Sequence, residues 1–261
     1  MPVSWINKER LLERQLGTFL NLGNACAARV AADLGFDWVL IDLEHGAGSE
    51  HSLPNITMAI EGTGCSPIVR VVSNHQDQIK RALDLGAAGV MVPYISTANE
   101  AAAAVSFTRY PPRGVRGVAS STVATGFGLR AEQYQREAET QILTIVQIET
   151  GEGVENAEQI AAVEGVDVLF VGPLDLSFQL GCPRNFEHPT QLAALDRVVA
   201  ACRNQGKPAG ILSNIDNVAD HLQRGFSFVA IGSESAALID GFQRLKKAAN
   251  GEGREASNRP K

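Results

Sequence analysis

Eight short apolar runs alternate with helix-like segments along almost the whole chain, and this alternation constrains the fold more than any other feature. The runs are rich in Val, Ile and Leu, as expected of parallel strands that are buried on both faces. Strands are predicted at residues 16–22, 37–43, 67–72, 88–93, 142–149, 166–171, 209–212 and 226–231. Eight strand–helix units in 261 residues predict an α/β fold and favour a single closed (β/α)8 TIM barrel over a doubly wound sheet.

The segments between the strands complete the predicted barrel. Helices are predicted at residues 5–13, 25–34, 50–61, 76–85, 99–108, 130–140, 154–163, 217–224 and 234–249, with a further helical region up to residue 202. Residues 109–129 form a long loop, which inside a compact domain is usually functional or disordered. We expect one barrel domain at 1–250 and a flexible polar tail at 251–261, because that tail has almost nothing to bury.

The composition argues against several classes of partner. A formal net charge of −6 and an isoelectric point of about 5.4 disfavour nucleic acid and anionic membrane surfaces. No apolar run reaches membrane-spanning length, and charged residues follow the first positions too soon for a signal peptide. The four cysteines are scattered without metal-ligand spacing, which predicts reduced thiols in a cytoplasmic protein.

Polar side chains follow the predicted strands at their carboxyl ends, where barrels of this type hold their active sites. The second strand ends in Asp42 and His45, close enough in sequence for the carboxylate to orient the imidazole if the turn folds back. An acidic turn with a surface histidine is the alternative. Arg70 ends the third strand, and a buried guanidinium needs an anion, either a protein carboxylate or a substrate oxygen.

Two carboxylates near later strand ends predict a metal site. Gln147 and Glu149 are two residues apart on one strand, so both side chains point into the barrel. There an ionised glutamate needs a metal or an ion-pair partner such as Arg70. Asp175 follows the sixth strand, where it either caps a helix or helps to hold a ligand. Together, Glu149 and Asp175 form an open oxygen-ligand site of the kind that Mg²⁺, Mn²⁺ or Co²⁺ accepts.

The positions of the other chemically active residues narrow the mechanism. None of the six lysines lies at a predicted strand carboxyl end, which disfavours a Schiff-base aldolase, because that chemistry needs a lysine at the barrel mouth. A glycine-rich phosphate loop is also absent, which disfavours a phosphosugar isomerase. The remaining histidines are predicted to be surface or capping residues: His51, His75, His188 and His221.

Seven segments of the sequence, taken together, are similar to the motifs of one known family, although none of them is specific alone. They are Phe-Asp-Trp-Val-Leu-Ile-Asp-Leu-Glu-His (36–45), Val-Arg (69–70), Arg-Tyr-Pro-Pro-Arg-Gly-Val-Arg-Gly-Val (109–118), Val-Gln-Ile-Glu-Thr (146–150), Val-Glu-Gly-Val-Asp (163–167), Gly-Pro-Leu-Asp-Leu-Ser (172–177) and Gly-Ile-Leu (210–212). In this order they resemble the HpcH/HpaI family of class II, metal-dependent pyruvate aldolases. That family includes 4-hydroxy-2-oxoheptanedioate aldolase, 2-keto-3-deoxy-L-rhamnonate aldolase and 2-dehydro-3-deoxyglucarate aldolase.

The resemblance implies a barrel of the phosphoenolpyruvate/pyruvate type and a role for each matching residue. Glu149 and Asp175 would hold a divalent metal ion (Mg²⁺, Mn²⁺ or Co²⁺), and Gln147 would support that site. Arg70 would face the bound keto acid. His45 would act as the base, oriented by Asp42. Asp84 also matches an acid associated with the family's site, in a secondary role.

The implied activity is that of an aldehyde-lyase. It would reversibly cleave a 4-hydroxy-2-keto acid into an aldehyde and pyruvate, or a related 2-keto acid such as hydroxypyruvate, through a metal-stabilised enolate. The resemblance also implies a homo-oligomer, a hexamer built as a trimer of dimers, in which the last helix (234–249) packs on a neighbouring barrel.

Departures from the family pattern fall around the aldehyde. Phe19 stands where some members have tryptophan, Leu174 where they have alanine, and residues 120–129 lack their aromatic and basic side chains. We expect Phe19, Leu174, Leu212 and residues 119–129 to shape the aldehyde pocket.

Two other functions compatible with the same residues are a barrel lyase that acts on another acid or on a malyl or citryl thioester of CoA, and a keto-acid-binding protein without turnover. The acidic chain offers no plain basic groove for CoA. The presence of His45 and Arg70 disfavours the pure binder, because binding alone needs no base.

Overall fold

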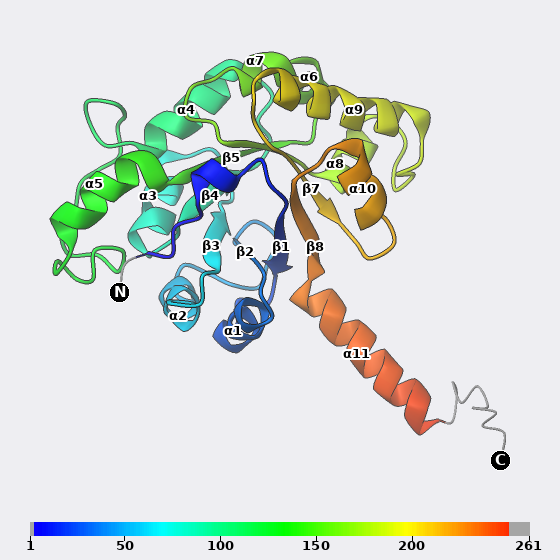
Figure 1. Cartoon of the computed structure of the whole chain (residues 1–261), viewed down its shortest axis with the longest axis horizontal. Coiled ribbons are helices and arrows are strands. Elements are labelled where there is room, and N and C mark those ends of the chain that lie inside the picture. Colours follow the sequence, from blue (N-terminus) through cyan, green and yellow to red (C-terminus); the bar gives the residue numbers. More distant parts are fainter. Residues whose placement is uncertain (1–2, 251–261) are drawn as a thin grey trace.

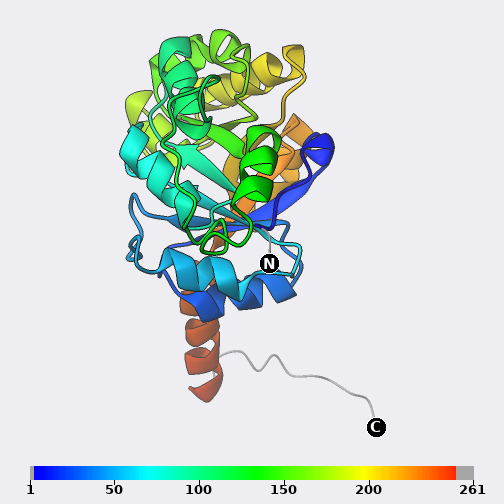
Figure 2. The same ribbon diagram turned by 90° about the vertical axis from the view of Figure 1, so that its left-hand side faces the viewer.

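The computed structural model describes residues 3–250; the predicted flexible tail at 251–261 lies outside the described residues. Eight parallel strands, hydrogen-bonded in chain order, close into a barrel with helices on its outside (Figure 1 and Figure 2). The strands are β1 (Gln15–Leu20), β2 (Trp38–Asp42), β3 (Ser66–Arg70), β4 (Gly89–Val92), β5 (Leu143–Ile148), β6 (Val168–Val171), β7 (Ala209–Ser213) and β8 (Phe228–Ser233). The predicted (β/α)8 barrel is confirmed.

The helices follow the strands in the expected alternation. They are α1 (Ala25–Asp33), α2 (Leu53–Ala59), α3 (Gln76–Asp84), α4 (Ala98–Thr108), α5 (Ala131–Gln141), α6 (Gly151–Glu155), α7 (Ala157–Ala161), α8 (Pro173–Gln179), α9 (Pro189–Asn204), α10 (Val218–Arg224) and α11 (Glu234–Ala249). Side-chain caps start several of them; at α4, Thr97 and Glu100 form a reciprocal capping box. Within residues 3–250 no helix is long and apolar enough to cross a membrane.

Two predicted helices differ from the structure. The helix expected at 5–13 is only a short 3₁₀ turn, η1 (Lys8–Arg10), because Ile6 and Leu11 on either side insert into the apolar cluster inside the barrel. The single helix expected at 154–163 is two helices, α6 and α7, which meet at Asn156. The side-chain amide of Asn156 donates a hydrogen bond to the carbonyl of Ser96 at 2.8 Å.

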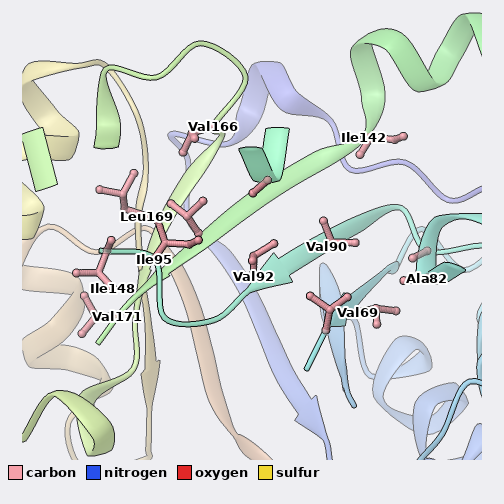
Figure 3. Close-up of a cluster of buried hydrophobic side chains, with 14 of the residues drawn as sticks. Val69, Ala82, Val90, Val92, Ile95, Ile142, Ile148, Val166, Leu169 and Val171 are labelled. Carbon is pink, nitrogen blue, oxygen red and sulfur yellow. The ribbon is translucent and has the colours of Figure 1, made fainter. Parts of the chain in front are cut away.

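Alternate residues of each strand pack on opposite sides of the barrel wall. Val69, Val90, Ile148 and Leu169 face the surrounding helices and join the larger apolar cluster (Figure 3). Ala82 of α3 packs into the same layer. This outer layer anchors the helices to the barrel, so that the strand ends are held in fixed relative positions.

The inner layer fills the barrel below its mouth. Trp38 stacks on Phe228 with ring centroids 4.3 Å apart, and both side chains are fully buried. Gly17 leaves room for the indole, since a Cβ there would lie 2.2 Å from the Trp38 ring. The charged side chains of the barrel interior lie at the carboxyl ends of the strands, where the candidate site lies.

Candidate active site

The register of β2 against β3 places Asp42 directly opposite Arg70. Both side chains point inward, and the guanidinium donates to both carboxylate oxygens, at 2.9 and 2.8 Å. A second acid, Glu44, lies 3.1 Å from the same guanidinium. Burial raises the pKa of Asp42, but the hydrogen bonds and the positive charge of Arg70 outweigh this effect. The pKa of Asp42 therefore lies below its usual value. Arg70 therefore pairs with Asp42 and Glu44 rather than with Glu149, the ion-pair alternative raised by the sequence.

The structure corrects the expected contact between Asp42 and the His45 imidazole. The Asp42 carboxylate instead accepts hydrogen bonds from the backbone N–H groups of Glu44 and His45, at 3.1 and 3.3 Å. The turn thus folds back through its main chain, and the imidazole stays free to face solvent. It is 63% exposed and lies 3.7 Å from the Glu44 carboxylate. Glu44, not Asp42, is the acid nearest the imidazole among the contacts that the structure shows.

Glu149 follows β5 at the barrel mouth and is 1% exposed. The side-chain amide of Gln147 donates to one carboxylate oxygen at 2.8 Å, and the backbone N–H of Tyr94 donates to the other at 3.0 Å. Gly172 makes this packing possible, because a Cβ at that position would lie 2.4 Å from the carboxylate. The prediction that Gln147 and Glu149 point into the barrel is confirmed.

Tyr94 links Glu149 to Asp175. It lies just after β4 with a φ of 54°, a left-handed conformation that is uncommon outside glycine. From there its hydroxyl donates to a carboxylate oxygen of Asp175 at 3.2 Å, while its N–H binds Glu149. Asp175 lies in the first turn of α8. One residue thus contacts both carboxylates predicted to bind metal.

The charges at the mouth fit a divalent cation. The Arg70 guanidinium interacts with Asp42, Glu44 and Glu149, and Asp175 adds a fourth negative charge near Glu44 and Glu149. Burial raises the pKa of Glu149 to about 7, with further contributions from Glu44 and Asp175. A cation beside these oxygens would favour the ionised form. Within residues 3–250 no group of three or more His, Cys, Asp or Glu side chains could hold a metal ion. A metal bound by Glu149 and Asp175 alone would keep positions for water and substrate, because Mg²⁺ in proteins usually keeps several waters.

The raised pKa of Glu149 predicts a pH-dependent stability for the metal-free protein. In the folded protein the Glu149 carboxyl keeps its proton up to about pH 7, whereas in the unfolded chain it loses the proton near its ordinary pKa of 4.5. The folded state therefore binds more protons in this window, and its stability falls as the pH rises through it, by up to about 3 kcal/mol. The difference in thermal midpoint between wild type and Glu149→Gln in EDTA, measured from pH 5 to 8, checks this. A difference that does not change with pH would contradict it.

The residues predicted to contact the aldehyde lie at one end of a large cavity. Phe19, Leu174 and Leu212 line it, and its volume is about 760 Å³. The cavity adjoins the mouth but is not lined by Arg70, Glu149 or Asp175; it extends between the α8–α9 loop and α10, which lie together in Figure 1. We call it the rim cavity. The Phe19 ring also lies under the Arg70 guanidinium, 5.2 Å from ring centroid to Cζ.

Two other predicted contributors lie away from this end of the barrel. Asp84 is the last residue of α3 and pairs at 2.8 Å with the fully buried guanidinium of Arg116. Within this chain the loop at 119–129 packs near α2, where it lines a smaller cavity of about 260 Å³ with Thr57 and Met58. The structure therefore does not bring Asp84 or this loop to the cluster at the strand ends.

The remaining histidines and cysteines mostly match the sequence prediction. His75 and His188 cap α3 and α9 through their Nδ1 atoms. His221 differs, because its Nδ1 lies 2.8 Å from the Ser213 hydroxyl and its ring lines the rim cavity. All four cysteines are free.

Sequence reasoning gave no role to Glu44, Tyr94 or His221. Glu44 and Tyr94 lie just beyond strand ends, where alternation no longer tells which way a side chain points. The Ser213–His221 spacing of eight residues signals nothing until β7 and α10 are packed together.

Comparisons with known proteins agree with this geometry. A family model described as HpcH/HpaI aldolase/citrate lyase matches residues 15–241. The chain is 40% identical to a pyruvate aldolase of Rhizobium etli, over 94% of this chain and 97% of that protein. It is also 40% identical to a 2-dehydro-3,6-dideoxy-6-sulfogluconate aldolase of Pseudomonas putida, over 92% of this chain and 96% of that protein. A crystal structure of an HpcH/HpaI aldolase/citrate lyase family protein from Burkholderia cenocepacia superposes with a TM-score of 0.89 at 35% identity, covering 93% of this chain and 98% of that one.

Proposed function

Because the chain belongs to the HpcH/HpaI aldolase/citrate lyase family, we propose that it is a divalent-metal-dependent aldolase. It reversibly cleaves a 4-hydroxy-2-keto acid into an aldehyde and pyruvate or a closely related 2-keto acid. The observation that carries this proposal is the cluster at the strand ends, in which Arg70 and four carboxylates gather and an exposed imidazole lies beside Glu44. The names of the relatives, a pyruvate aldolase and a sulfogluconate aldolase, support the same class of reaction.

In the proposed site, Glu149 and Asp175 hold the metal, whose Lewis acidity would polarise the substrate ketone. Arg70 has five N–H donors; two of them are hydrogen-bonded to Asp42, and the guanidinium also forms an ion pair with Glu44. The N–H groups not bonded to Asp42 would stabilise negative charge on the ketone oxygen.

Cleavage needs a base for the C4 hydroxyl, and His45 is the residue proposed for this task. As the proton leaves, the C4–O bond gains double-bond character and the aldehyde forms. The C3–C4 bond breaks, and its electron pair moves to C3, giving the enolate of pyruvate. A proton added at C3 completes the cycle. An exposed imidazole can exchange its proton with water between these two steps.

Pyruvate release from a panel of 4-hydroxy-2-keto acids tests the proposal, measured with lactate dehydrogenase as the coupling enzyme. We expect EDTA to abolish the release and Mg²⁺, Mn²⁺ or Co²⁺ to restore it. A malyl or citryl thioester of CoA, assayed separately for glyoxylate or oxaloacetate because neither releases pyruvate, tests the related lyase reaction. Pyruvate release that persists in EDTA would contradict the assignment of Glu149 and Asp175.

Tyr94→Phe is expected to weaken metal binding about tenfold. The substitution removes only the hydroxyl that donates to Asp175, and loss of a group that orients a metal ligand typically costs a factor of 10 to 100 in affinity. The backbone N–H that donates to Glu149 remains. Competition with a fluorescent chelator measures the metal dissociation constant directly. Tyr110→Phe, at a tyrosine that stacks on Arg116 away from the mouth, is the matched control.

The last helix supports the proposed homo-oligomer. α11 extends away from the barrel in both views (Figure 1 and Figure 2) and has no buried residue. Four of its large apolar side chains are exposed: Leu238, Ile239, Phe242 and Leu245. A surface of this kind marks an interaction site. We propose that α11 packs on a neighbouring copy, in a hexamer arranged as a trimer of dimers.

Phe242→Glu combined with Leu238→Glu is expected to dissociate the oligomer. Both side chains are exposed in the single chain, so the charges cost nothing within the barrel but oppose an apolar interface. Sedimentation velocity measures the assembly state, with Arg244→Glu on the same helix as a control for charge alone. An unchanged sedimentation coefficient would show that α11 is not the interface. The cytoplasmic location expected from the cysteines stays a prediction.

A further inference from the structure

The rim cavity is larger than a keto acid needs and begins where the aldehyde is expected. Its volume of about 760 Å³ lies within the range of small-molecule sites. Phe19, whose ring lies against Arg70, lines the cavity together with Leu174 and Leu212, and most of the other lining residues have polar side chains. A substrate whose reacting carbonyl lies at the mouth would therefore place the rest of its aldehyde chain in this cavity.

The first polar feature of the wall is the pair formed by Ser213 and His221. The hydroxyl oxygen lies 2.8 Å from Nδ1, and the imidazole edge packs against Phe226 at 5.8 Å between centroids. Burial lowers the pKa of His221, which favours the neutral ring. A neutral imidazole has one N–H donor and one acceptor. Since Nδ1 binds Ser213, the other ring nitrogen is left for a hydroxyl group in the cavity.

The second feature is a buried amide with an unused acceptor. Gln191 of α9 is 0% exposed and lines the cavity. Its Nε2 donates to the carbonyl of Pro173 at 3.0 Å, which fixes the amide, yet its Oε1 has no hydrogen-bond partner among the described residues. A buried acceptor without a donor costs free energy. A ligand O–H group would supply that donor.

The charges of the wall indicate that the ligand is neutral. The charged residues that line the cavity are two arginines, Arg184 and Arg224, and three acids: Glu187, Asp196 and Asp220. Arg224 is already paired with Asp196. Because the acids outnumber the cations, the wall favours hydroxyl groups over a carboxylate, sulfonate or phosphate.

We propose that the rim cavity binds the chain of a neutral, polyhydroxylated aldehyde, with hydroxyl groups at His221 and Gln191 and the carbonyl at the barrel mouth. This inference rests on the proposed aldolase function and names its aldehyde class. His221 and Gln191 act as specificity residues, since they contact the distal part of the substrate and not the reacting atoms.

The test is the aldol addition of saturating pyruvate to four-carbon aldehydes that differ in their substituents. Erythrose carries hydroxyl groups, butanal carries none, and succinic semialdehyde carries a carboxylate. We expect kcat/KM to be at least about tenfold higher for erythrose than for butanal when both are calculated from the concentration of the open, unhydrated aldehyde. Two neutral hydrogen bonds would give a difference of this size. His221→Phe and Gln191→Leu should each lower this ratio at least about threefold. His51→Phe, at an exposed histidine outside the cavity, should leave the ratio as it is.

A second measurement separates this inference from the proposed function. Exchange of the pyruvate methyl protons in D₂O reports enolate formation without any aldehyde, and it also shows that each variant is folded and loaded with metal. No exchange in the wild type would contradict the proposed function. Exchange together with equal use of erythrose and butanal, a preference for succinic semialdehyde, or a ratio unchanged in both variants would overturn the inference alone.

Discussion

Glu149→Gln is expected to abolish pyruvate release, with kcat/KM reduced at least about a thousandfold. The amide keeps the shape of the side chain but removes the buried charge that we propose as a metal ligand. A bound metal contributes several kcal/mol of transition-state stabilisation, and each 1.4 kcal/mol is about a factor of ten in rate. The coupled assay for pyruvate measures the loss, and chelator competition measures the accompanying loss of metal binding.

The same variant separates chemistry from folding. Glu149 is buried, and burial raises the pKa of its carboxyl to about 7, so its ionised form destabilises the metal-free protein above that pH. The neutral glutamine should therefore fold at least as stably as the metal-free wild type at pH 8. Glu152→Gln, at an exposed position on α6, is the control and should stay active. More than about a tenth of wild-type activity in Glu149→Gln would exclude this residue as a metal ligand.

Arg70→Ala is expected to lower kcat at least about a hundredfold, the cost of removing one donor to a developing oxyanion. It should also lower the thermal midpoint, because the substitution leaves Asp42 and Glu44 without their cation. Loss of one partner from a buried ion pair costs about 3–5 kcal/mol. The loss should be smaller at acid pH, where the two carboxyls bind protons.

A double variant distinguishes the two effects of Arg70. Arg70→Met with Asp42→Asn removes the positive charge and one negative charge together, so it should recover much of the stability without recovering turnover. Activity near the wild-type level in either protein would exclude Arg70 from the reaction. Turnover that returns along with stability in the double variant would assign Arg70 a structural role only.

The sequence predicted the strand ends well because strand geometry is regular. Alternation along β5 placed Gln147 and Glu149 in the barrel, and their hydrogen bond in the structure agrees with that placement. The apolar segments of β2 and β3 likewise predicted that Asp42 and Arg70 lie at strand ends, although the partner of Asp42 was expected to be His45. The register between two strands, which no single segment contains, decides that Arg70 is the partner.

What the sequence could not predict lies where the chain leaves regular structure. The contacts of Tyr94 depend on a positive φ that only the assembled turn imposes. The burial of Arg116 depends on a 21-residue loop at 109–129 returning to α3 and α5. Residue-level patterns have no period in such segments, so side-chain direction there follows from tertiary packing.

Because Asp42 pairs with Arg70 across two adjacent strands, catalysis also depends on the correct register of β2 against β3. A slip of one residue between β2 and β3 would turn each inward side chain of the slipped strand toward the helices. The Trp38 ring would also lose its place beside Gly17 if β2 slipped. Turnover would vanish, because the guanidinium and its carboxylate would lie on opposite sides of the wall. Selection for activity in this protein is thus also selection for the correct β2–β3 register.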